Sequence, residues 1–248
     1  DVCSSDLHFD GASGLDVRKQ ATLFEDESED FAIEFWMRGE REQTAGAVLL
    51  NVAADSDVPE STTLQLTTDD AGGLQLRMGN TVETVLTKGL ALNDNNWHHI
   101  ALNVLRNGTS AVYIDGQRRK NLLSSEIPTV RNRDFTIGAM KSDGQMTNGF
   151  RGDIDEFRYW RATLSKDLID EQRYEQLDTL AAHEQGLALY LPFEYRTLDA
   201  ARQVVTSFST ADHSGSGASV ANFDVAQSTA APGLKGAPVG RNLDFDIV

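Results

Sequence analysis

The sequence predicts an all-β protein, a two-sheet antiparallel sandwich with a single helix. Two observations support this class. Short segments in which apolar and polar residues alternate recur along the chain as far as residue 193, and turn-forming pairs such as Asp115-Gly116 separate them. These turns recur at spacings of roughly 8–12 residues, which is typical of sandwiches and barrels and not of βαβ units.

The segment 31–37 is the clearest strand. Successive side chains of a strand point to opposite faces, so Glu34 and Trp36 share one face and the apolar set occupies the buried face. That buried set is Phe31, Ile33, Phe35 and Met37. Further strands are predicted at residues 46–52, 63–66, 74–78, 82–86, 97–104, 110–114, 135–138, 150–159 and 187–193.

A hairpin is predicted where Asn107-Gly108 lies between the segments 97–104 and 110–114. Both turn residues tolerate a positive φ, which two-residue hairpin turns require. One helix is predicted from about Lys166 to Ala181. Ser165 precedes it as N-cap, and an incomplete apolar stripe follows along the helix.

The composition of the chain changes after residue 195. Residues 1–195 carry the strand pattern, whereas 196–248 are rich in Ala, Ser, Thr and Gly. We expect a sandwich domain over 1–195 and an irregular extension over 196–248 that leads into a following domain. The chain starts Asp1-Val2-Cys3 without methionine, so we expect it to be a processed piece of a longer protein. Cys3 is the only cysteine, which excludes an internal disulfide.

The formal net charge of −16 disfavours several partners. Nucleic-acid binding depends on Lys and Arg neutralising phosphates, so a strongly acidic chain is not expected to bind nucleic acid. Anionic membranes are disfavoured for the same reason. No run of apolar residues is long enough to predict insertion into a membrane.

The order of motifs resembles a known family. The motifs are Leu7-His8-Phe9-Asp10-Gly11, the strand 31–37, Trp97-His98-His99-Ile100-Ala101 followed by 111–116, Phe135-Thr136-Ile137-Gly138, and 150–160 followed by Leu164-Ser165. This order is similar to that of laminin G-like, pentraxin-type concanavalin A-like jelly-roll domains. The resemblance implies a non-catalytic recognition, adhesion or spacer domain of a larger, bacterial, extracellular or cell-surface protein. Its partners would be a glycan or a cell-surface protein, together with neighbouring domains of the same chain.

Some enzymes with this fold cleave polysaccharides. Their acidic residues alternate along one strand and point into the same groove. The alternation of the 150–159 strand places Asp153 and Asp155 on one face, but the next position on that face is Phe157, and Glu156 points the other way. Because Phe157 stands where the third carboxylate of the alternating pattern is expected, the sequence disfavours hydrolase activity. A polysaccharide-acting enzyme, or the carbohydrate-binding module attached to one, remains the alternative function, and a spacer without ligand is a third.

Calcium is the more plausible chemistry for the acidic residues. The ion takes six to eight oxygen ligands, which Asp side chains and loop carbonyls supply. The resemblance places Asp10 near the strand that holds Asp153 and Asp155, so these three residues are the candidate ligands of a structural Ca²⁺. The loops with Asp55 and Asp57, and with Asp69 and Asp70, are rivals, although turn formation alone explains them.

Other motifs carry weaker signals. Trp36 shares a face with Glu34 opposite the buried face, which makes it the best candidate to stack on a sugar. Arg151-Gly152-Asp153 spells an integrin-recognition tripeptide but falls within a strand pattern. The adjacent His98 and His99 point to opposite faces and cannot chelate one ion together, so we expect one buried and one exposed.

Overall fold

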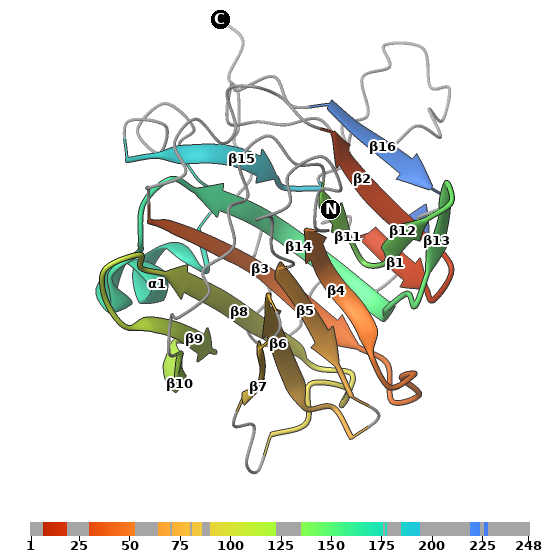
Figure 1. Cartoon of the computed structure of the whole chain (residues 1–248), viewed down its shortest axis with the longest axis horizontal. Coiled ribbons are helices and arrows are strands. Elements are labelled where there is room, and N and C mark those ends of the chain that lie inside the picture. Colours follow the sequence, from red (N-terminus) through yellow and green to blue (C-terminus); the bar gives the residue numbers. More distant parts are fainter. Residues whose placement is uncertain are drawn as a thin grey trace, which may run out of the picture.

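The computed structural model describes residues 7–18, 30–52, 64–69, 71–79, 81–85, 90–122, 135–175, 177, 185–193, 219–223 and 226–227. They form two large antiparallel sheets that lie face to face, a small hairpin and one helix (Figure 1). The predicted two-sheet antiparallel sandwich is therefore confirmed.

The first sheet has eight strands, and β3 and β14 lie at its centre. Its order is β10 (Gln117–Leu122), β9 (Ser110–Ile114), β8 (Trp97–Val104), β3 (Phe31–Gly39), β14 (Arg151–Trp160), β1 (Leu7–Asp10) and β17 (Ala226–Gln227), and β15 (Leu187–Leu191) also pairs with β14. We call it the eight-stranded sheet.

The second sheet has seven strands and lies in front of the first in Figure 1. Its order is β16 (Ser219–Phe223), β2 (Gly14–Arg18), β11 (Phe135–Ile137), β4 (Ala47–Val52), β5 (Leu64–Thr68), β6 (Leu74–Met78) and β7 (Thr81–Val85). The hairpin of β12 (Met140–Ser142) and β13 (Gln145–Thr147) follows β11. We call the second sheet the seven-stranded sheet.

The main core lies between the two sheets. It contains the apolar residues that alternate along β3, as predicted, and the inward residues of the opposing strands, such as Leu64, Leu66, Leu74 and Leu76. Burial of each such side chain contributes roughly 1.5–3 kcal/mol. The alternation that buries these leucines also directs the residues between them to the outer face of the seven-stranded sheet.

The helix α1 (Lys166–Gln172) covers part of the outer face of the eight-stranded sheet, where Ile169 joins a second core with Trp160 and Tyr190. The predicted N-cap is confirmed, because Ser165 Oγ accepts a hydrogen bond of 3.1 Å from the backbone N–H of Leu168. The helix is shorter than predicted and ends at Gln172, where Arg158 donates to the carbonyls of Gln172 and Glu175. The predicted end at Ala181 lies outside the described residues.

The predicted hairpin of β8 and β9 is present, but its turn differs from the expectation. Five residues, 105–109, connect the strands, and neither Asn107 nor Gly108 has a positive φ. The turn is held instead by the Ser110 hydroxyl, which accepts from Leu105 N–H at 2.9 Å. A longer loop does not need the left-handed residues that a two-residue turn requires.

Two strands of the segment 196–248 pair with the sandwich. Strand β16 pairs with β2 in the seven-stranded sheet, and β17 pairs with β1 in the eight-stranded sheet. This segment thus contributes a strand to each sheet, and its other residues, like Cys3, lie outside the described ranges. None of the described helices has the length and apolar character needed to cross a membrane.

Candidate functional site

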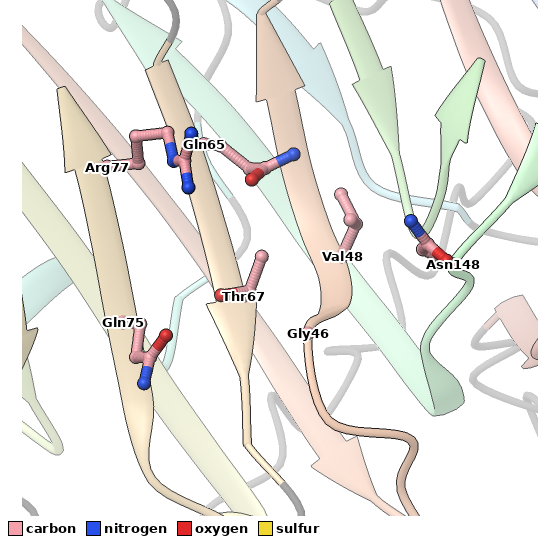
Figure 2. A pocket seen from close by; sticks show the side chains of 7 residues that line it. All are labelled: Gly46, Val48, Gln65, Thr67, Gln75, Arg77 and Asn148. Atoms are coloured by element: carbon pink, nitrogen blue, oxygen red, sulfur yellow. The ribbon is translucent and has the colours of Figure 1, made fainter. Parts of the chain in front are cut away.

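A polar hollow of about 240 Å³ lies on the seven-stranded sheet, away from the main core (Figure 2). Strands β4, β5 and β6 form its floor. The described residues that line this hollow are Gly46, Val48, Gln65, Thr67, Gln75, Arg77 and Asn148. We refer to it as the polar hollow.

Strand alternation places these side chains together. In β5 the core residues Leu64 and Leu66 leave Gln65 and Thr67 on the outer face, and in β6 the same pattern leaves Gln75 and Arg77 there. The pairs Gln65↔Arg77 and Thr67↔Gln75 lie directly opposite in register. Figure 2 shows Arg77 extending from β6 over the neighbouring strand β5.

A bulge and a hairpin form the other side of the hollow. The register of β4 shifts between Val48 and Leu50, so that Val48 pairs with Thr67 and faces outward. The backbone N–H of Val48 donates to the Asn148 carbonyl at 2.8 Å, which ties the end of the β12–β13 hairpin to β4. Gln65 Nε2 lies 3.1 Å from Asn51 Oδ1, and this contact orients the Gln65 amide.

The chemistry of the hollow is that of hydrogen bonding. Three amides and one hydroxyl can both donate and accept, and Arg77 adds a cation. None of the described lining residues is acidic or aromatic. The hollow therefore suits a ligand rich in hydroxyl groups, and its described lining lacks the paired carboxylates of a glycoside hydrolase.

Trp36 does not have the exposed face that sugar stacking requires. Only 2% of its surface is exposed. Its indole N–H donates to the Arg173 carbonyl at 2.7 Å, and its ring contacts His99 and Tyr174. The expectation of an exposed Trp36 is wrong, because the turn after α1 covers this face of the sheet.

The three candidate calcium ligands have other partners. Asp10 Oδ1 accepts from the backbone N–H groups of Ala12 and Ser13, both at 2.9 Å. These contacts, the Ala12 hydrogen bond above all, hold the pKa of the Asp10 carboxyl below its ordinary value.

Asp153 and Asp155 are buried and also engaged. Asp153 Oδ2 lies 2.5 Å from Arg38 Nη2, and its Oδ1 lies 3.1 Å from His8 Nδ1. Asp155 Oδ1 accepts from the backbone N–H of Glu156 at 2.8 Å. Among the described residues no group of three or more His, Cys, Asp or Glu side chains is placed to hold a metal. Asp10, Asp153 and Asp155 thus do not fit a common metal site in this arrangement. Of the rival residues, Asp69 accepts from Ala71 and Gly73 N–H as a turn residue, whereas Asp55, Asp57 and Asp70 lie outside the described ranges.

The faces of β14 differ from simple alternation. An extra residue between Asp155 and Arg158 breaks the register with β3, and Glu156 adopts a φ of 52° there. Phe157 therefore enters the main core, away from Asp155, which corrects the predicted arrangement. Glu156 instead accepts from Arg158 at 2.6 Å and from the Tyr190 hydroxyl at 2.8 Å.

Burial gives these carboxylates a structural role. Asp153, Asp155 and Glu156 are each 3–4% exposed, so no open groove presents them to a polysaccharide. Burial and the charge of Glu156 raise the pKa of Tyr190, which keeps its hydroxyl protonated as a donor. The acidic residues of β14 thus connect this strand to its neighbours β3 and β15 through Arg38 and Tyr190.

The remaining motifs also have structural partners. Arg151, Gly152 and Asp153 lie within β14 and not on a loop tip. His98 contacts Asp94 and Asp115, whereas His99 lies 3.4 Å from Glu34. Both histidines are buried, so the expectation of one exposed histidine is wrong.

The residues of the polar hollow were not singled out from the sequence. The available signal was the strict alternation of leucine with polar residues in Leu64-Gln65-Leu66-Thr67 and Leu74-Gln75-Leu76-Arg77. That pattern predicts two polar outer faces, but it does not reveal that the strands are neighbours or that Asn148 lies beside them.

Comparison with known proteins shows which family and which solved structures this chain resembles. A family model of the concanavalin A-like lectin/glucanases superfamily matches residues 9–170. Among curated proteins no match is found. A Bacteroides ovatus protein to which carbohydrate binding is ascribed has a similar structure, with a TM-score of 0.62 and 16% identity over 97% of this chain. This chain spans 62% of the length of that protein.

Two other solved structures share the fold. The heptameric SAP-like pentraxin of Limulus polyphemus has 12% identity and a TM-score of 0.54, over 68% of this chain and 82% of its own. The CBM40 domain of the Ruminococcus gnavus IT-sialidase has 19% identity and a TM-score of 0.52, over 66% of this chain and 95% of its own. At these identities the likeness concerns the fold.

Proposed function

This chain belongs to the concanavalin A-like lectin/glucanases superfamily, and on that premise we propose that it is a non-catalytic carbohydrate-binding domain of a larger extracellular protein. Its ligand would be a glycan, bound in the polar hollow. The Bacteroides ovatus protein and the CBM40 domain, which has also been solved with α2,3-sialyllactose, support this class of ligand.

The observation that carries the proposal is the concentration of hydrogen-bonding side chains in the hollow. Saccharide hydroxyls both donate and accept, and the amides of Gln65, Gln75 and Asn148 do the same. Binding sites commonly orient a ligand through a few convergent polar groups. Gln65 and Gln75 lie on paired strands, and the Asn148 carbonyl is hydrogen-bonded to β4, so these groups are held in place without a ligand.

The described carboxylates are not arranged for glycoside hydrolysis. A glycosidase needs two of them on either side of the scissile bond, about 5–5.5 Å apart in retaining enzymes. The described lining of the polar hollow contains none, and the acidic residues of β14 are buried against Arg38 and Arg158. The site is therefore built to hold a glycan and not to cleave it.

Its setting is proposed to be the cell surface. A glycan-binding domain there would connect neighbouring domains of the same chain to a polysaccharide or to the glycans of another cell. The net charge of −16 argues against nucleic acid as the partner.

The test is glycan-array screening of the whole chain, followed by calorimetric titration of the glycans that bind. We expect binding that Gln75→Ala weakens and that Gln117→Ala, an exposed glutamine on β10 of the other sheet, leaves unchanged. Absence of any bound glycan, or equal effects of both variants, would overturn the proposal. Release of reducing sugar from a bound polysaccharide would overturn its non-catalytic part.

A further inference from the structure

We propose that the glycan of the polar hollow carries a carboxylate and that Arg77 recognises it. This inference rests on the proposed function and names the chemical class of its ligand. The relevant sources are sugars with a carboxylate on the ring, such as uronic acids and sialic acids.

Arg77 is positioned to contact a ligand in the polar hollow. It is the only cation among the described residues that line the hollow, and it is exposed. Its place opposite Gln65 in the register of β5 and β6 directs it over the floor of the hollow (Figure 2). The guanidinium is thus available to a ligand in contact with the neighbouring amides.

Arg77 differs from several other described arginines in its lack of an ion-pair partner among the described residues. Four other arginines lie close to carboxylates, namely Arg38 with Asp153, Arg151 with Glu40, Arg158 with Glu34, and Arg173 with Asp170. Within the part of the chain that the structure describes, Arg77 has no such pair. Acidic residues outnumber basic ones in this chain, 38 to 22, yet Arg77 has no described carboxylate as its partner. Its guanidinium can therefore bind the carboxylate of a ligand.

The described lining of the hollow offers no aromatic ring for a sugar to stack on. Sugars without charge are commonly held by stacking on aromatic rings, but the described lining contains no aromatic residue. Its affinity must therefore come from polar contacts. The strongest polar contact available is the paired hydrogen bond of a guanidinium with a carboxylate, which fixes orientation as well as charge.

The charge of the hollow also favours a glycan that carries a carboxylate. The net charge of −16 repels an anionic glycan from most of the surface, whereas the described lining of the hollow carries only the positive charge of Arg77. An acidic sugar would bind there with its carboxylate on Arg77. Its hydroxyls would then lie against Thr67, Gln75 and Asn148.

The experiment compares matched ligands that differ in charge. Oligogalacturonate is titrated against its methyl-esterified form, and sialyllactose against its own methyl ester, so that the two pairs distinguish a uronic from a sialic acid. We expect one acidic ligand to bind at least about tenfold more tightly than its neutral partner, as a charged hydrogen bond implies.

Variants then assign the effect to Arg77. Arg77→Gln should weaken binding of the acidic ligand about tenfold and leave binding of the neutral partner unchanged. Arg77→Lys should weaken binding of the acidic ligand by a smaller factor, because lysine keeps the charge but lacks the planar guanidinium group. Arg118→Gln, on exposed β10, is the matched control. Melting curves of the variants should be unchanged, since Arg77 is exposed.

The outcomes separate the two proposals. Equal affinity for acidic and neutral partners, or full affinity of Arg77→Gln for the acidic ligand, would overturn the role of Arg77. If Gln75→Ala still weakened binding in that case, the hollow would remain a glycan site. If neither these ligands nor the array glycans bound, the proposed function itself would fall.

Discussion

Glu34 and Arg158 lie opposite each other on β3 and β14, with Glu34 Oε1 3.3 Å from Arg158 Nη1 and both side chains buried. Trp160 Nε1 also donates to Glu34 Oε1 at 3.2 Å. Burial opposes ionisation of Glu34, but the hydrogen bond to His99 and the charge of Arg158 outweigh it and lower the pKa of the carboxyl. This pair joins the central strands of the eight-stranded sheet beneath the segment that contains α1.

Removing one partner of this pair should strongly destabilise the fold. Arg158→Met leaves Glu34 and Glu156 as buried carboxylates without their cation, which should cost about 3–5 kcal/mol in the free energy of unfolding. Urea denaturation measures this loss. Lys166→Met, which breaks an exposed pair with Asp170, should change it by no more than about 0.5 kcal/mol. Similar losses for both variants would contradict the assigned role.

Stability should depend on the charge of His98. Burial opposes its protonation, but the hydrogen bond to Asp115 and the charges of Asp115 and Asp94 raise the pKa of His98 above its ordinary value. A raised pKa in the folded state means that this stabilisation is complete below about pH 6.5 and is lost as the pH rises through the folded pKa. We expect the free energy of unfolding to fall as the pH rises above about 6.5. His98→Gln should flatten this slope, and an unchanged slope would assign it to other groups.

Two glycines should respond differently to alanine. Gly152 in β14 has a φ of 140°, and an added Cβ would lie 2.1 Å from the Arg38 carbonyl oxygen. Gly152→Ala should therefore lower the free energy of unfolding by about 3 kcal/mol or more. In the β8–β9 loop, Gly108 has an ordinary φ, and Gly108→Ala should cost less than about 1 kcal/mol. Thermal melting of both variants checks the ranking, and a larger loss for Gly108→Ala would reverse it.

Calcium can be tested by melting the chain in EDTA and in calcium chloride. The carboxylates of Asp10 and Asp153 are already engaged by backbone N–H groups and by Arg38, so we expect the same melting temperature in both solutions. A fall of several degrees in EDTA would instead support the structural calcium that the order of motifs suggests. Asp10→Asn, measured in both solutions, would then show whether Asp10 is a ligand.

Local patterns predicted most of the strands because a buried face leaves a period of two in the sequence. The alternation in β3, the pairing of β8 with β9 and the Ser165 cap all follow from residues close together in the chain. The predictions were wrong where the environment of a residue depends on contacts with residues distant in the sequence. Trp36 was assigned to an exposed face, for example, because nothing near it in the sequence indicates that the turn after α1 covers it.

The candidate site also combines features that the sequence predicts with features that only the tertiary structure decides. Sequence alternation by itself determined the sandwich, the inward leucines and the outward position of Gln65 and Arg77, because side-chain direction in a strand depends only on position along it. Only the tertiary structure decided that β5 and β6 pair in this register, that the end of a hairpin some 70 residues later in the sequence brings Asn148 beside them, and that a bulge turns Phe157 inward. Those facts depend on contacts between distant segments, whose free energy is a property of the folded chain as a whole.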